Sequence, residues 1–301
     1  MSQKDGEKLK TDNKYSQPFV RKPEWLRRPM AFRGRQNEVE RKINSYNLHT
    51  VCSEARCPNR SECHAMGTAT FLVMGAICTR NCSFCSVAGG IPEPLDWNEI
   101  GRVVAASGSM GLRHVVITSV TRDDLPDGGG SFFACLVAEF RKSLPDVTVE
   151  LLIPDLAGNM QALEKIFASK PDVLNHNIET VPSLYKIIRP EADYRRSLAV
   201  LAAAADHKLI VKSGMMVGLG EDREEVFSVL EDLTRCGCSI VTIGQYLQPS
   251  LQQNVVIKYI APEQFERYAE YGRKIGLKRV VAGPFVRSSY HAAEVISQVG
   301  V

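Results

Sequence analysis

The sequence predicts an α/β protein whose centre is a partial (β/α)6 barrel of parallel strands, with an N-terminal cluster-binding extension and a short C-terminal segment. From about residue 69 onward, short apolar strands alternate with helical stretches, as in parallel strands joined by right-handed crossovers. Six of the nine cysteines fall between Cys52 and Cys85, which indicates a site for soft metal ions. We therefore expect a basic arm (1–45), a cysteine-bearing lobe (46–68), the barrel (69–285) and a closing segment (286–301).

The composition is that of an ordinary soluble protein. Of 301 residues, 44% are hydrophobic and 24% are charged, and the formal net charge of +3 is too small to predict a nucleic-acid partner. No apolar run reaches the roughly 18 residues of a membrane span, so no membrane association is expected. The charged start, with Lys4, Asp5 and Glu7, lacks the apolar core of a secretory signal. We expect a cytoplasmic protein whose thiols stay reduced.

The segment 1–45 is polar, basic and interrupted by prolines, and we expect it to be extended. Its clustered basic side chains are Arg21, Lys22, Arg27, Arg28, Arg33 and Arg35. Such a cluster is typical of a solvated arm, and it also suits a docking site for an acidic partner. Residues 46–68 show no clear periodicity, so we expect a loop-rich lobe there.

The barrel prediction rests on apolar runs that alternate with helical segments. The expected strands are 70–75, 114–119, 148–153, 173–178, 209–217 and 240–246. The expected helices are 97–107, 131–143, 160–168, 194–206, 221–235 and 262–274. The last begins at Pro262, where a missing N–H costs nothing. Roughly six units are too few for a closed eightfold barrel and enough for an open, curved one, although a flavodoxin-like open sheet fits the same pattern.

One cysteine triplet lies directly after the first expected barrel strand. Cys78, Cys82 and Cys85 have the spacing C-x3-C-x2-C in the loop CTRNCSFC, and loops at the carboxyl ends of barrel strands carry active sites. Three adjacent thiolates suit an iron–sulfur cluster and leave one iron for another ligand. Zinc is the alternative metal, but its ligands usually come as two C-x2-C pairs, which this spacing does not match.

The loop resembles the signature of the radical S-adenosylmethionine (SAM) superfamily, in which an aromatic residue, here Phe84, precedes the last cysteine. The resemblance covers residues 69–285. It implies a 4Fe–4S cluster on Cys78, Cys82 and Cys85, with the amino and carboxylate groups of SAM on the open iron. It also implies reductive cleavage of SAM to a radical that abstracts hydrogen from an aliphatic carbon, which needs the strongly negative potentials that such clusters reach.

The other triplet, Cys52-x4-Cys57-x5-Cys63, narrows the resemblance. Its surroundings, TVCSEARCPNRSECHAMGTATFLVMG, are similar to the auxiliary-cluster motif of the lipoyl synthase family. The likeness continues through RDDLPDGGG (122–130), VELLIPD (149–155), NHNIETV (175–181), IRPEADYRRSL (188–198), GLGE (218–221) and AGPFVRSSYHA (282–292). The resemblance implies a second 4Fe–4S cluster on these cysteines, with Ser289 as its fourth ligand and Ser288 as the weaker candidate.

Lipoyl synthases insert two sulfur atoms, at C6 and C8, into a protein-bound octanoyl chain, and the resemblance implies that the auxiliary cluster donates the sulfur. Oxygen is a harder donor than thiolate and a poorer partner for iron, so Ser289 would mark an iron meant for release. The implied partners are an octanoylated lipoyl carrier domain, from a dehydrogenase E2 subunit or the glycine cleavage H protein, and a low-potential electron donor such as ferredoxin or flavodoxin.

Six further residues are predicted to contact SAM: Thr118, Ser119, Glu150, Asn177, Arg195 and Met215. The first four lie at or near expected strand ends, where organising the barrel loops is their alternative role. Arg195 could pair with the methionine carboxylate as a planar fork, or form a surface ion pair. Met215 could pack on the adenine, or simply fill the core.

Cys135, Cys236 and Cys238 lie apart from both triplets. The C-x-C pair Cys236 and Cys238 could suggest a metal site, but at a helix end beside Gly237 we expect buried thiols. Three other functions remain compatible with the sequence. A two-cluster electron carrier would not need SAM, and a structural scaffold would bind zinc. A methylthiotransferase would act on RNA or protein and usually adds an RNA-binding domain.

Overall fold

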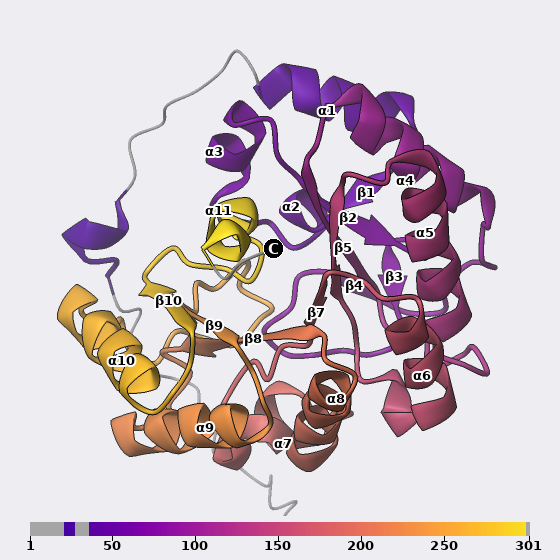
Figure 1. The fold of residues 1–301 in the computed structure, drawn as a ribbon. Helices are drawn as coiled ribbons and strands as arrows, with labels where there is room; N and C mark the ends of the chain where they lie inside the picture. The colour runs from indigo at the N-terminus through magenta and orange to yellow at the C-terminus, as the bar shows by residue number, and fades with distance from the viewer. Residues whose placement is uncertain (1–20, 28–35, 299–301) are drawn as a thin grey trace, which may run out of the picture.

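The structure, a computed structural model, describes residues 21–27 and 36–298 (Figure 1). The main sheet of this part has eight strands in the order β1-β2-β5-β6-β7-β8-β9-β10. Their bounds are β1 His49–Thr50, β2 Thr70–Val73, β5 His114–Ser119, β6 Thr148–Leu152, β7 Val173–Asn175, β8 Ile210–Val217, β9 Ile240–Gln245 and β10 Arg279–Gly283. Neighbours from β2 to β10 are parallel, and β1 is antiparallel to β2.

The parallel strands follow one another across the sheet in chain order, and this order decides between the two predicted architectures. A flavodoxin-like sheet reverses its order at a switch point, whereas this sheet does not. Helices on the outside cover it: α4 Asn98–Ser109, α5 Gly130–Ser143, α6 Met160–Ala168, α8 Tyr194–Asp206, α9 Arg223–Arg235 and α10 Pro262–Lys274 (Figure 1). The partial barrel is confirmed, and the open doubly wound sheet is excluded.

The predicted strands and helices have the burial and capping that their sequences indicate. Val115, Val116 and Ile117 of β5 are all buried, as expected for a parallel strand that is covered on both faces. Helix α9 begins with a capping box, in which the Asp222 carboxylate accepts from the Glu225 N–H and the Glu225 side chain accepts in return.

Strand β10 is a parallel strand that the sequence analysis missed. It has five residues, RVVAG, of which only Val280 is buried. It lies at the end of the sheet and pairs only with β9, so its sequence lacks the continuous apolar run of a central strand.

The N-terminal extension is more helical than expected. Helix α1 (Gln36–Ser45) occupies the end of the segment predicted to be extended, because Val39 and Ile43 recur at helical spacing and join the main core. Short helices α2 (Val51–Glu54) and α3 (Arg60–Ala65) carry the lobe that was expected to be loops. Apart from residues 21–27, which include the short 3-10 helix η1 (Glu24–Leu26), the rest of the predicted arm lies outside the described residues.

The C-terminal segment returns to the barrel and ends in α11 (Ala292–Ser297). Figure 1 shows α11 between the N-terminal helices and the strands β8–β10. Val295 and Ile296 pack there with Val173 and Ile240, which open β7 and β9. Burying two such side chains stabilises the docked tail by roughly 1.5–3 kcal/mol each.

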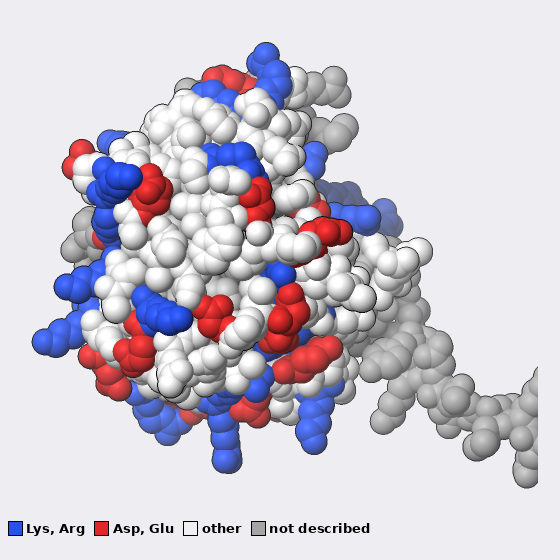
Figure 2. Space-filling model, turned by 90° about the vertical axis from the view of Figure 1, so that its right-hand side faces the viewer, with Lys and Arg blue, Asp and Glu red and all other residues white. Residues whose placement is uncertain are grey.

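Charges of both signs are mixed on the face shown in Figure 2, which is the side of α4, α5 and α6 in Figure 1. Within residues 21–27 and 36–298, no helix has both the length and the apolar character that a membrane crossing requires.

Candidate functional site

Strand β2 leads directly into the loop that carries the second cysteine triplet. The chain turns at Met74 and Gly75, whose φ values are 65° and 92°. Cys78 ends the short strand β3 (Ile77–Cys78), which pairs with β4 (Ala88–Gly89). The Cys85 N–H donates to the Cys82 carbonyl at 3.0 Å. The three cysteines therefore share one tight loop at the carboxyl end of β2.

Arg80, inside this loop, fastens it to the barrel. Its guanidinium donates to Asp123 at 2.6 Å and pairs with Asp155 at 2.7 Å. Burial alone would raise the pKa of Asp155, but hydrogen bonds from Arg80 and Arg196 hold that pKa down at about 2. Arg80 thus ties the cysteine loop to the segments that follow β5 and β6.

Burial favours the protonated form of two thiols in this loop. Burial raises the pKa of Cys82 to about 11 and that of Cys85 to about 12, so neither ionises readily without a nearby cation. The Cys78 sulfur accepts N–H groups from Arg80 at 3.4 Å and from Thr121 at 3.3 Å. Hydrogen bonds to sulfur tune the potential of iron–sulfur clusters. The donor set and its surroundings are therefore compatible with such a cluster.

A cavity of about 330 Å³, which we call the radical-site cavity, opens beside this loop. That volume is within the range of small-molecule sites. The predicted site residues that line it are Cys52, Cys57, Cys78, Cys82, Cys85, Thr118, Ser119, Asn177, Met215 and Ser289. Residues of both triplets thus line one cavity.

The predicted SAM contacts in this wall differ in how they are bonded. The Ser119 hydroxyl is buried and has no hydrogen-bond partner among the described residues. The Thr118 hydroxyl donates to the Leu152 carbonyl at 2.7 Å, so its proton is already engaged. Met215 is buried in the wall. A buried hydroxyl without a partner is the group most in need of a ligand.

Two of the predicted SAM contacts, Glu150 and Arg195, do not line this cavity. Glu150 does not line the cavity: its carboxylate is fully buried and accepts from Lys212 at 2.8 Å and from Asn175 at 3.1 Å. Although burial opposes ionisation, Lys212 holds the pKa of Glu150 at about 2. Arg195 is exposed and lies outside the lining, while its neighbour Arg196 pairs with Asp155. Glu150 forms a buried ion pair within the sheet, and Arg195 lies on the exposed side of α8.

Sequence reasoning missed the charged residues of the cavity wall, and two of them, Glu179 and Arg189, stand out. Arg189 is buried, and its Nε has no hydrogen-bond partner among the described residues, while one terminal nitrogen donates to the Asn177 carbonyl at 3.0 Å. Glu179 has a φ of 65°, and burial, opposed by Arg189, raises its pKa. The positive φ of a non-glycine residue occurs often at functional sites, but a sequence does not show it.

The first triplet lines an adjoining cavity of about 210 Å³, which we call the auxiliary cavity. Cys52 lies in α2, Cys63 lies in α3, and Cys57 lies between them. All three line this cavity together with Ser289 from the C-terminal tail. Burial raises the pKa of Cys52 to about 11. This donor set, three thiols and one hydroxyl, matches the one that the sequence resemblance implied.

The two cavities have a common wall. Cys52, Cys57, Thr70, Arg287 and Ser289 line both of them. The two cavities are therefore direct neighbours.

A site for a single metal ion would need its ligands closer together than a cluster does. No group of three or more His, Cys, Asp or Glu among the described residues is placed to hold one metal ion. In a cubane cluster each thiolate binds a different iron, so its ligands stand farther apart than those of a single zinc ion. None of the nine cysteines, all of which lie among the described residues, is joined in a disulfide. Of the three outside the triplets, Cys238 is buried as predicted, Cys236 is partly buried, and Cys135 is exposed.

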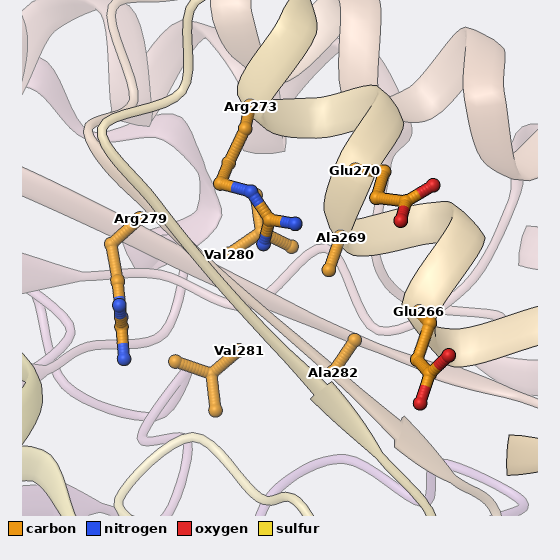
Figure 3. Close-up of a pocket in the computed structure, with 8 residues that line it drawn as sticks. All are labelled: Glu266, Ala269, Glu270, Arg273, Arg279, Val280, Val281 and Ala282. Atoms are coloured by element: carbon orange, nitrogen blue, oxygen red, sulfur yellow. The ribbon is translucent and has the colours of Figure 1, made fainter. Parts of the chain in front are cut away.

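Another groove, of about 330 Å³, lies between α10 and the edge strand β10 (Figure 3). Glu266, Glu270 and Arg273 of α10 border it, with Arg279 of β10. It is lined by no cysteine and by none of the predicted site residues. We therefore assign the chemistry to the two adjoining cavities.

Comparison with known proteins agrees with these features. Residues 72–233 match the family model described as the radical SAM superfamily. A lipoyl synthase from Caldanaerobacter subterraneus subsp. tengcongensis is 54% identical over 275 residues, which is 91% of this chain and 96% of the relative. A lipoyl synthase from Oleidesulfovibrio alaskensis is 48% identical over 283 residues, 94% of this chain and 97% of the relative.

Solved structures show the same fold at low sequence identity. Methylornithine synthase has a TM-score of 0.53 at 15% identity, with 82% of this chain and 81% of that chain covered. SuiB of Streptococcus suis, bound to its precursor peptide SuiA, has a TM-score of 0.55 at 12% identity, with 82% of this chain and 52% of that chain covered.

Proposed function

This chain belongs to the lipoyl synthase family of the radical SAM superfamily, and from that premise we propose that it inserts sulfur at C6 and C8 of a protein-bound octanoyl chain. Family membership implies a 4Fe–4S cluster and SAM. The finer proposal, a second cluster that is consumed as the sulfur source, is carried by the common wall of the two cysteine-lined cavities. Proximity of this kind replaces a bimolecular encounter with a positioned reaction.

In the radical-site cavity, the residues of the chain hold and shield the reactants. When bound, the cluster and SAM supply a radical that abstracts hydrogen. We assign Cys78, Cys82 and Cys85 to the cluster. Arg189, a buried guanidinium in the cavity wall with an unpartnered Nε, would receive the methionine carboxylate, and the Ser119 hydroxyl would donate to another polar group of SAM. The role given to Arg195 in the sequence analysis passes to Arg189.

In the auxiliary cavity, Cys52, Cys57, Cys63 and Ser289 would hold the second 4Fe–4S cluster. A serine oxygen is a weaker partner for cluster iron than a thiolate. Ser289 would therefore hold the iron that is bound most weakly, which suits a cluster that supplies sulfur. The placement of Ser289 in both cavity walls supports this assignment.

The substrate proposal follows from the apolar part of the radical-site cavity. Leu72, Phe84, Val87 and Leu247 line it and suit a saturated acyl chain. The chain would be presented by a lipoyl carrier domain, from a dehydrogenase E2 subunit or the glycine cleavage H protein. A low-potential donor such as ferredoxin or flavodoxin would supply electrons. We place the enzyme in the cytoplasm, where thiols stay reduced.

Replacement of Ser289 by cysteine tests the sulfur-donor assignment. The variant should retain both clusters and still form 5′-deoxyadenosine, but its lipoyl product should form about tenfold more slowly, as expected if the stronger ligand adds roughly 1.4 kcal/mol to the barrier. Iron per chain, 5′-deoxyadenosine and lipoylated octanoyl peptide are measured after anaerobic reconstitution. Cys135→Ser, at an exposed thiol outside both cavities, is the matched control.

Undiminished product formation by Ser289→Cys would overturn the labile-iron assignment. Two clusters without 5′-deoxyadenosine in the wild-type protein would favour an electron carrier instead. A colourless protein that binds zinc would contradict both.

A further inference from the structure

A hydrogen-bonded chain runs from the C-terminal tail into the radical-site cavity. The Ser288 hydroxyl donates to Asn177 Oδ1 at 2.8 Å, and Asn177 Nδ2 donates to Glu179 Oε1 at 3.0 Å. All three residues line the radical-site cavity, and the next residue, Ser289, lines both cavities. Asn177 thus uses its amide oxygen toward Ser288 and its amide nitrogen toward Glu179.

Two glycines make room for the tail at this point. A Cβ on Gly214 of β8 would lie 2.8 Å from Asn177 Oδ1 and 2.9 Å from the Ser288 hydroxyl. A Cβ on Gly244 of β9 would lie 2.1 Å from the Val286 carbonyl oxygen. The tail therefore touches both strands where they lack side chains, so it can reach Asn177.

The tail is also fastened to the auxiliary lobe on both sides of Ser289. Asn59, between Cys57 and Cys63, donates to the Phe285 carbonyl at 2.7 Å and is buried. The Tyr290 hydroxyl donates to Glu62 at 2.8 Å. Ser288 connects this tail to the barrel wall, between the two attachments to the lobe.

From this arrangement we propose that Ser288 is a positioning residue, which directs Ser289 toward the auxiliary cysteines by anchoring the tail on Asn177. The inference rests on the proposed function, since it needs Ser289 to be a cluster ligand. Ser288 and Ser289 are joined by a planar peptide bond. Holding the Ser288 side chain on the barrel wall therefore restricts the directions in which the Ser289 side chain can point. Without the anchor, SAM cleavage continues while sulfur insertion falls behind it.

Two variants test the anchor. Ser288→Ala removes the hydroxyl, and Ser288→Thr keeps it. After anaerobic reconstitution, the measurements are melting temperature, iron lost to a chelator over time, and the ratio of lipoyl product to 5′-deoxyadenosine. For Ser288→Ala we expect an unchanged melting temperature, faster iron loss and a product ratio lowered about two- to tenfold, the range that one hydrogen bond provides. Ser288→Thr should restore the ratio.

Asn177→Asp distinguishes the hydrogen bond to Ser288 from the hydrogen bond to Glu179. It keeps an acceptor for Ser288 but replaces the donor to Glu179 with a like charge, so it should retain more of the product ratio than Ser288→Ala. A wild-type ratio and wild-type iron retention in Ser288→Ala would overturn the inference, and so would failure of threonine to rescue. If Ser289→Ala also keeps the wild-type ratio, Ser289 is not a cluster ligand and the proposed function itself is wrong. If only Ser288→Ala keeps the wild-type ratio, the anchoring role of Ser288 alone is wrong.

Discussion

Arg80 illustrates how the cysteine loop depends on a side chain that no cysteine motif includes. It is buried and pairs with two carboxylates, of which Asp155 is fully buried and Asp123 is partly exposed. Its role is to place three sulfurs, because it joins their loop to the segments after β5 and β6. Breaking a buried charge pair by removing one partner costs several kcal/mol, since the other charge is left inside.

Asp155 would keep its pair with Arg196, so replacing Arg80 by alanine should destabilise the protein by about 3 kcal/mol, the lower end of that cost. The melting temperature and the iron bound at the radical site should both fall. The matched control is Arg102→Ala, since Arg102 pairs with Asp96 at 2.7 Å with both side chains partly exposed. An exposed pair of this kind contributes at most about 1 kcal/mol. Equal effects of the two substitutions would contradict the structural role given to Arg80.

Single residues were predictable from the sequence where the chemistry is local. The three cysteines of CTRNCSFC lie within one loop, so their spacing alone indicates one site. Glu150 and Arg189 differ, because their roles depend on which way a side chain points and on what lies across the barrel. Glu150 meets Lys212, which is 62 residues away in the chain, and no periodicity reports that contact.

At the scale of elements, the C-terminal tail and the strands β8 and β9 form one unit. The tail occupies space that exists because Gly244 lacks a side chain, and its own backbone oxygen fills that space. An added methyl group here meets backbone, which cannot rotate away, so the tail must shift. Overpacking of this kind costs roughly 1–3 kcal/mol.

Gly244→Ala should displace the tail and lower the occupancy of the auxiliary cluster, while the radical-site cluster remains. Iron per chain and 5′-deoxyadenosine formation measure the two sites separately. Gly101→Ala on α4 is the control, because its Cβ meets nothing within 4 Å and alanine favours the helix. A Gly244→Ala protein with two full clusters would show that the tail does not depend on this space.

The predicted strands and helices were those with long apolar runs or clear helical spacing. β10 and α11 were missed because they are short, and their burial depends on neighbours from elsewhere in the chain. Helix α1 was missed because its apolar face is narrow, and the sequence around it is basic and proline-rich.

At the scale of the whole molecule, the site joins the segments that precede and follow the barrel. Cys52 and Cys57 precede the barrel, Ser289 follows it, and the fold brings them to the common wall of the two cavities, one of which Cys78 also lines. The barrel class was predictable from the alternation of elements. The adjacency of the two cavities was not, because it depends on the return of the tail across the sheet.

This adjacency leads to the central claim, that one site makes a radical and the other is consumed as the source of sulfur. The most direct measurement reconstitutes the protein with isotopically labelled sulfide and determines the mass of the lipoyl product after a single turnover in unlabelled buffer. We predict that both inserted sulfur atoms carry the label. Unlabelled product, formed by protein that holds both clusters, would contradict the account.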